Sequence, residues 1–183
     1  SYNPMEYTIN IKGHLMDLST PQVMGILNVT PDSFYSGSRK QTEMEIAQRA
    51  NQIIEEGGSI IDVGAFSTRP GADEVSEEEE GRRLKFALDI VRREQPDAAV
   101  SVDTYRPTLA RKCIEEWGAD IINDVSEGGI TGIANVPLEQ RQEEYPEMFR
   151  VVGELKVPYI LMSVQPTLAT MMKGFAREVQ QLR

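Results

Sequence analysis

Hydrophobic positions along the chain alternate between two patterns. Short apolar runs rich in Val and Ile recur five times, and each is followed by a loop and then by apolar residues at helical spacing. The five runs are QVMGILNV, SIIDVG, AAVSVDT, ADIINDV and VPYILMS. Strands that alternate with helices in this way form parallel sheets covered by helices, so the pattern predicts an α/β fold.

Each predicted helix carries one apolar stripe that would face the sheet. The stripes are Ile46, Ala50, Ile53 and Ile54; Leu84, Leu88 and Val91; Leu109, Cys113, Ile114 and Trp117; Met148, Phe149, Val152 and Leu155; and Leu168, Met172, Phe175, Val179 and Leu182. Ser76 and Glu79 form a capping-box pattern at the start of the second helix. The acidic run Glu77 to Glu80 is interpreted as a solvated first turn favoured by the helix dipole. The sequence of residues 7–18 predicts a small hairpin that could close the bottom of a barrel.

Polar residues interrupt three of the predicted strands near their carboxyl ends. Because strand side chains alternate, Asp62 lies opposite Ile61 and Val63, Ser101 and Asp103 share a face, and Asn123 lies opposite Ile122 and Asp124. Taken singly, each polar residue has a structural interpretation as a strand-end or capping group, which is favoured for Asp62 and Asp124 and evenly balanced for Asp103 and Asn123. Taken together at matching positions, they favour a ligand that presents several N–H donors on one edge.

Composition narrows the functional classes. The 183 residues carry a formal net charge of −10, which argues against non-specific binding to nucleic acid or to an anionic membrane. One Cys and one His exclude an internal disulfide and clustered His/Cys zinc sites. Neither a secretory signal nor an apolar run of the roughly 20 residues needed to span a bilayer is evident. We therefore predict a cytoplasmic protein. The missing G-x-G-x-x-G and Walker loops weaken a nucleotide-binding interpretation.

Four motifs resemble those of dihydropteroate synthase: GILNVTPDSF, IIDVGAFSTRPGA, SVDTYRP and GADIINDVS, in this order and spacing. The hairpin TINIKGHLMDLS is also similar to that family. The resemblance implies a (β/α)8 TIM barrel, of which this chain holds about five βα units. The implied domain is a pterin-binding domain over residues 1–183, incomplete at its carboxyl end and containing the hairpin at 7–18.

The resemblance also implies an activity in folate biosynthesis. The family condenses 6-hydroxymethyl-7,8-dihydropterin diphosphate with p-aminobenzoate and releases pyrophosphate, which makes it a transferase of a pterinylmethyl group to an aryl amine. Mg²⁺ is the implied cofactor, and sulfonamides act on the family as substrate mimics. The implied partners are these small molecules, without nucleic acid or membrane, and a homodimer is a candidate assembly.

Ten residues match functional positions of the family. Asn28 is the implied metal ligand, and Asp32 and Arg69 are the implied catalytic residues, with Arg69 meeting the leaving pyrophosphate. Substrate binding is implied for Phe34, Thr68, Pro70, Asp103, Asn123, Val125 and Met162. Among these, Phe34 and Pro70 would contact p-aminobenzoate, whereas Asp103, Asn123 and Met162 would contact the pterin.

The chain departs from the family pattern in several places. Ser36 stands where the family often has a loop Asp, and Asp32 is the remaining carboxylate there. The fifth strand continues as MSVQP without the usual His, and the segment after Ser126 is longer than in the family. Because the later motifs and three βα units do not appear, we expect the chain alone to lack synthase activity.

Two alternatives stay open. One is a pterin barrel like the methyltetrahydrofolate:corrinoid methyltransferases, which share strand-end Asp and Asn residues but lack the NVTPDSF and STRPG loops. The other is a non-catalytic fragment that needs a second chain to complete its barrel. Cys113 and Trp117 are interpreted as core residues, and Arg106 as either a structural ion-pair partner or a contact at the rim of the site.

Overall fold

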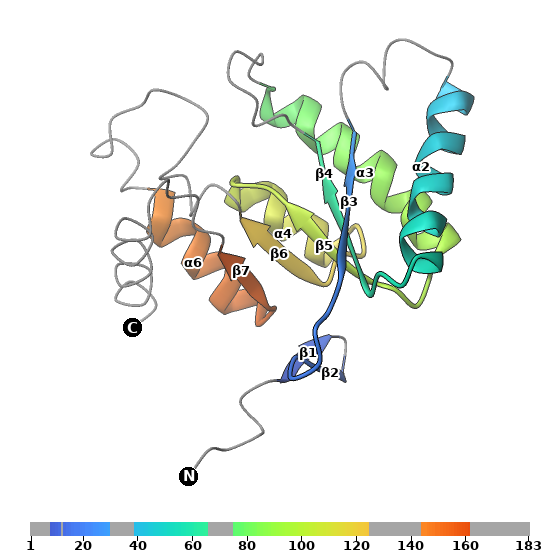
Figure 1. Cartoon of the computed structure of the whole chain (residues 1–183). Helices are drawn as coiled ribbons and strands as arrows, with labels where there is room; N and C mark the ends of the chain where they lie inside the picture. Colours follow the sequence, from blue (N-terminus) through green and yellow to red (C-terminus); the bar gives the residue numbers. More distant parts are fainter. Residues whose placement is uncertain (1–7, 12, 30–38, 66–74, 125–143, 162–183) are drawn as a thin grey trace, which may run out of the picture.

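The computed structural model describes residues 8–11, 13–29, 39–65, 75–124 and 144–161. Its strands are β1 (Thr8–Ile11), β2 (His14–Asp17), β3 (Met24–Asn28), β4 (Ile60–Gly64), β5 (Ala99–Asp103), β6 (Ile121–Asp124) and β7 (Tyr159–Leu161). Its helices are α2 (Arg39–Glu55), α3 (Glu77–Glu94), α4 (Pro107–Glu115) and α6 (Glu144–Leu155). Strands β3 to β7 form one parallel sheet in chain order, which confirms the α/β prediction (Figure 1). The predicted helix at 168–182 lies outside the described residues.

The main hydrophobic core lies between the sheet and its helices. Alternate strand residues such as Leu27, Ile61, Val102 and Ile122 are buried there together with the apolar stripes of the helices. The predicted core position of Cys113 is confirmed, because its side chain is fully buried in this cluster and burial raises the pKa of its thiol. The helix-facing side of each strand therefore matches the alternation in the sequence.

The start of α3 confirms one prediction and corrects another. The Ser76 hydroxyl accepts a hydrogen bond from the Glu79 N–H at 3.2 Å, as the capping pattern predicts. The interpretation of the whole acidic run as solvated is wrong for Glu80, which is 1% exposed, whereas Glu77 and Glu78 are exposed. Glu80 lies one helical turn before Leu84 and therefore shares the buried face of the helix.

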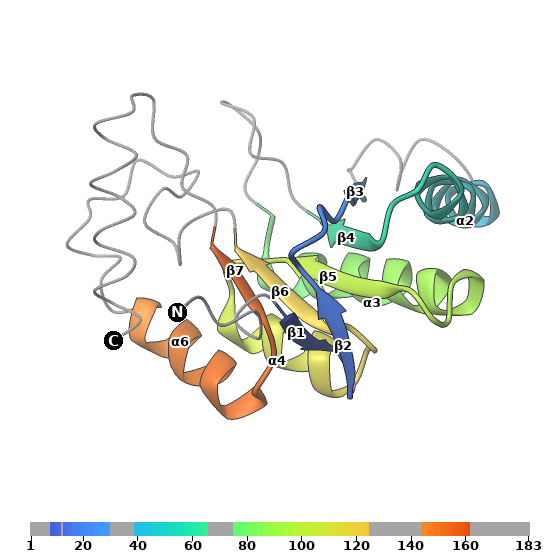
Figure 2. The same ribbon diagram turned by 60° about the horizontal axis from the view of Figure 1, so that its bottom comes forward.

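The amino ends of the strands are covered by the hairpin. Strands β1 and β2 pair antiparallel, which confirms the predicted hairpin (Figure 2). Ile11 of the hairpin packs with Ile60, Ala99 and Ile121 in a second, smaller apolar cluster. These three strand residues lie on the face opposite the helices, so the hairpin closes the amino end of the inner face of the sheet.

A buried ion pair fixes the same end of the sheet. The Arg92 guanidinium donates to the Asp120 carboxylate at 2.6 Å and to the carbonyl oxygens of Gly118 and Ala98 at 2.8 and 2.6 Å. Asp120 also accepts from the Val100 N–H at 2.9 Å. These contacts tie α3 to the amino ends of β5 and β6, the next two strands along the chain. In the described part of the chain, no helix is both long and apolar enough to cross a membrane.

Candidate functional site

Three predicted site residues lie at one level of the sheet. The parallel register pairs Asn28 with Gly64, Gly64 with Asp103, and Asp103 with Asn123 on successive strands. These residues sit at the carboxyl ends of β3 to β6, where parallel α/β proteins place their ligands. We call this row the carboxyl-end row.

Gly64 leaves room for the side chains on either side of it. A Cβ atom at this position would lie 2.9 Å from the Asn28 Oδ1 and 3.5 Å from the Asp103 Cβ. The side chains of Asn28 and Asp103 therefore converge over the Gly64 backbone, on the inner face. Sequence reasoning missed Gly64, although a glycine at the same strand level as two polar residues was a usable signal.

Asn123 presents a buried acceptor at this level. Its side chain is 2% exposed, and its Nδ2 donates to the Met24 sulfur at 3.7 Å across the inner face. Its Oδ1 is buried and accepts no hydrogen bond from any described residue. A buried amide oxygen left in this state is costly, and a ligand N–H is one way to satisfy it. Asp103 is half-buried at the same level.

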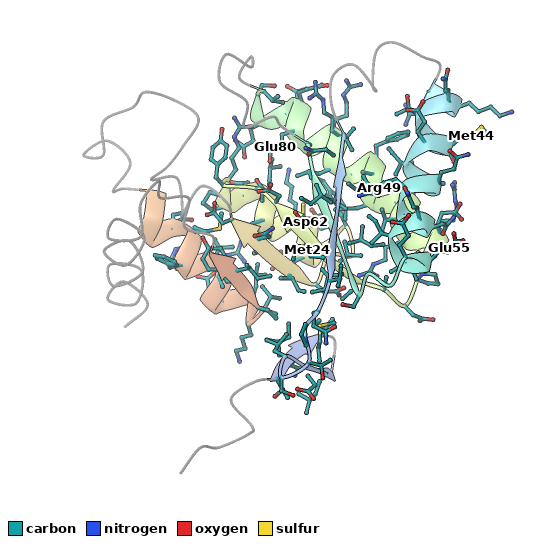
Figure 3. The ribbon with its side chains drawn as sticks, viewed as in Figure 1. Met24, Met44, Arg49, Glu55, Asp62 and Glu80 are labelled. Carbon is teal, nitrogen blue, oxygen red and sulfur yellow. The ribbon has the colours of Figure 1, made fainter. Side chains whose placement is uncertain are left out.

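Asp62 lies on the inner face one layer below the carboxyl-end row. Its side chain is nearly fully buried, and Figure 3 shows it with Met24 inside the curve of the sheet. The Ser101 hydroxyl donates to Asp62 Oδ1 at 2.6 Å, and the Asn123 side chain donates to the same carboxylate. Burial raises the pKa of Asp62, and the two hydrogen bonds partly oppose that shift. Asp62 is therefore more than a strand-end residue, because it forms a hydrogen bond with the predicted site residue Asn123.

Asp124 differs from Asp62 although both are buried strand acids. Its carboxylate accepts from the Tyr159 hydroxyl at 2.7 Å, and the Tyr159 ring packs edge-on against Phe149 of α6. Asp124 therefore lies on the helix side of β6, as the alternation with Asn123 predicts, and its role there is structural.

Charged residues hold the chain on both sides of segment 66–74. The Arg83 guanidinium donates to the Ala65 carbonyl at 3.3 Å, just before the segment. The Arg106 guanidinium donates to the Val75 carbonyl at 2.7 Å, just after it, and pairs with Glu80 at 3.0 Å. Of the two interpretations left open for Arg106, its described contacts are those of a structural ion pair.

The other predicted site residues lie outside the described residues. They are Asp32, Phe34, Thr68, Arg69, Pro70, Val125 and Met162. Along the chain, all of them follow the carboxyl ends of β3, β4, β6 and β7. Within the described ranges, no group of three or more His, Cys, Asp and Glu side chains is arranged to hold a metal ion.

Comparison with known proteins shows the family of the chain. The family described as pterin binding enzyme matches residues 24–182. The chain belongs to this family. The dihydropteroate synthase of Escherichia coli K12 is 38% identical over 163 residues, covering 89% of this chain and 52% of that protein. A mitochondrial folate synthesis bifunctional protein of Arabidopsis thaliana is 39% identical over 170 residues, covering 91% of this chain and 28% of that protein.

Solved structures of pterin binding enzymes share the fold. A dihydropteroate synthase of Xanthomonas albilineans with 4-aminobenzoic acid has a TM-score of 0.76 and 30% identity, covering 97% of this chain and 61% of that chain. The same organism's enzyme in complex with 7,8-dihydropteroate has a TM-score of 0.67 and 27% identity, covering 96% of this chain and 61% of that chain. The resemblance to dihydropteroate synthase and the partial TIM barrel are therefore confirmed. The chain spans about half the length of the bacterial synthase it matches.

Proposed function

We propose that this chain supplies the pterin-binding part of a dihydropteroate synthase. Such an enzyme joins 6-hydroxymethyl-7,8-dihydropterin diphosphate to p-aminobenzoate and releases pyrophosphate. The observation that carries the proposal is the carboxyl-end row, in which Asn28, Asp103 and Asn123 reach one level of the inner face. Groups at one level on neighbouring strands can contact a single small molecule.

The pterin is proposed to lie against Asp103 and Asn123. An ionised Asp accepts hydrogen bonds only, and the Asn123 Oδ1 is a further acceptor, so the pair suits the N–H donors of a pterin edge. Val125 and Met162 follow the ends of neighbouring strands in the sequence and are proposed to pack on the same ring. Apolar contact on the faces and acceptors on the edge would fix both the position and the orientation of the pterin.

The diphosphate is proposed to lie beside Asn28. Its Oδ1 lies over Gly64, 2.9 Å from the position that a Cβ atom would take there, and a carbonyl-type oxygen is a ligand that suits Mg²⁺. Asn28 therefore fits the proposed metal as one ligand. When bound, Mg²⁺ would neutralise charge on the departing pyrophosphate. Thr68 and Arg69 are proposed to bind the same leaving group, and Asp32 to act near the carbon that becomes electron-poor as the group departs.

The aminobenzoate is proposed to lie between Phe34 and Pro70. Both residues belong to segments that leave the carboxyl ends of strands, and their apolar rings would exclude water from the reacting carbon. The Glu80–Arg106 pair supports this arrangement, because Arg106 fixes the chain at Val75, close to Pro70 in the sequence. A cytoplasmic location and a homodimer also stay predictions, and one of the relatives is a mitochondrial protein.

Calorimetric titration of the 183-residue chain with 6-hydroxymethylpterin tests the binding proposal. We expect saturable binding at one site, and at least about tenfold weaker binding by Asp103→Ala, because a charge-assisted hydrogen bond is lost. Asp89→Ala is the matched control, since Asp89 pairs with Lys85 on the exposed side of α3. Equal affinities of the wild-type chain and Asp103→Ala would contradict the proposed function.

A further inference from the structure

The Asn123 carboxamide has its donors and its acceptor in different environments. Its NH₂ group donates to the Asp62 carboxylate and to the Met24 sulfur. Its Oδ1 is buried and accepts no hydrogen bond from the described residues. An amide in isolation can rotate to exchange these ends, so something must select this orientation.

Asp62 can select the orientation because a carboxylate has no donor. If the Asn123 amide rotated by half a turn, its oxygen would face the Asp62 oxygens, and two acceptors would meet in a buried site. Ser101 cannot relieve that conflict, since its hydroxyl already donates to Asp62 Oδ1 at 2.6 Å. All three side chains are at least 95% buried, so solvent would not easily take over the lost hydrogen bonds.

We propose that Asp62, held by Ser101, is a positioning residue that keeps Asn123 as a hydrogen-bond acceptor toward the ligand. This inference rests on the proposed pterin site and sharpens it. With Asp103 also an acceptor, the Asp103 and Asn123 positions of the carboxyl-end row would present only acceptors to the ligand. The site would therefore prefer a ligand whose edge carries an amino group over one whose edge carries a carbonyl.

The affinities of two pteridines test this preference for an amino group over a carbonyl. Pterin carries an amino group at position 2, and lumazine carries a carbonyl oxygen there. Against a row of acceptors, that oxygen leaves two acceptors facing each other, so we expect the wild-type chain to bind pterin at least about tenfold more tightly than lumazine. In Asp62→Asn, the new amide can either donate or accept, which lets Asn123 rotate. We expect the ratio of affinities to fall to about threefold or less, chiefly through weaker pterin binding.

A matched control distinguishes positioning from a general loss of stability. Asp124→Asn makes the same substitution in a buried strand acid on the helix side of the sheet, where the Tyr159 hydroxyl can still donate to it. We expect its pterin-to-lumazine ratio to equal that of the wild-type chain. Ser101→Ala should also lower the pterin-to-lumazine ratio, but by less than Asp62→Asn. If Asp62→Asn does not fold, Ser101→Ala is the variant that tests the inference.

The outcomes separate the inference from the function it rests on. Wild-type selectivity that persists in both Asp62→Asn and Ser101→Ala would overturn the positioning role while leaving pterin binding in place. A wild-type chain that binds neither pteridine would overturn the proposed function and this inference with it. A ratio that falls in these two variants and not in Asp124→Asn supports the inference.

Discussion

Buried acids near the two ends of the parallel sheet have different partners. At the amino end, Asp120 is neutralised by Arg92 and lies beside the apolar cluster under the hairpin. Near the carboxyl end, Asp62 is held by the neutral groups of Ser101 and Asn123. Removing the cationic partner of a buried acid is strongly destabilising, because the remaining charge is then buried without compensation. We infer from this contrast that Asp120 has a structural role, whereas Asp62 belongs to the proposed binding site.

Breaking the ion pair at the amino end should have the largest effect. Arg92→Met leaves the Asp120 carboxylate buried without its guanidinium and removes the donors to Gly118 and Ala98. We expect the free energy of unfolding to fall by about 3 kcal/mol, measured by urea denaturation. Lys85→Met, which breaks an exposed pair on the same helix, should cost less than about 0.5 kcal/mol. Equal losses in the two variants would contradict the structural role of Asp120.

A side chain at Gly64 should instead affect binding. In Gly64→Ala the new Cβ would lie 2.9 Å from Asn28 Oδ1, so the amide must move away from the carboxyl-end row. We expect affinity for the pterin diphosphate in the presence of Mg²⁺ to fall about tenfold, or about 1.4 kcal/mol. Gly153→Ala is the control, because nothing lies within 4 Å of its Cβ position on α6. It should leave affinity unchanged, and a similar loss there would show that the Gly64 effect is not local.

The dependence of stability on pH should show the smallest effect. Burial raises the pKa of Asp62 in the folded chain above its ordinary value of 3.8, so the folded chain retains this proton to higher pH than the unfolded chain. The stability associated with the neutral acid is present below pH 3.8 and is lost as the pH rises through the folded pKa.

Denaturation of the wild-type chain and of Asp62→Asn, from pH 3.8 up through the folded pKa of Asp62, isolates the contribution of Asp62 to stability. We expect the free energy of unfolding of the wild-type chain to fall relative to the variant as the pH rises, by at most about 1.4 kcal/mol per pH unit, the limit for one proton. A difference between the two proteins that does not change with pH, or that changes in the opposite direction, would show that Asp62 is not a desolvated acid.

Local sequence patterns were sufficient for the five strands of the parallel sheet and for the faces they present, whereas their order in the sheet followed from the barrel that the resemblance implies. The alternation around Asp62, Asp103 and Asn123 predicted their common face because period two is a property of any strand. The prediction that Glu80 is solvated was wrong because four consecutive acidic residues are typical of an exposed first turn. Its spacing of four residues from Leu84 indicated a buried position. The Arg92–Asp120 pair joins residues 28 positions apart, and no local pattern reports such a contact.

A crystal structure of the chain with a bound pterin tests the account most directly. We predict that ring N–H groups lie within hydrogen-bond distance of Asp103 and of Asn123 Oδ1, with the substituent at position 6 directed toward Asn28. The amino end offers the contrasting location, a cavity of about 600 Å³ lined by residues that include Ile11, Arg92 and Asp120. A pterin bound in that cavity, or anywhere away from the carboxyl-end row, would contradict the account.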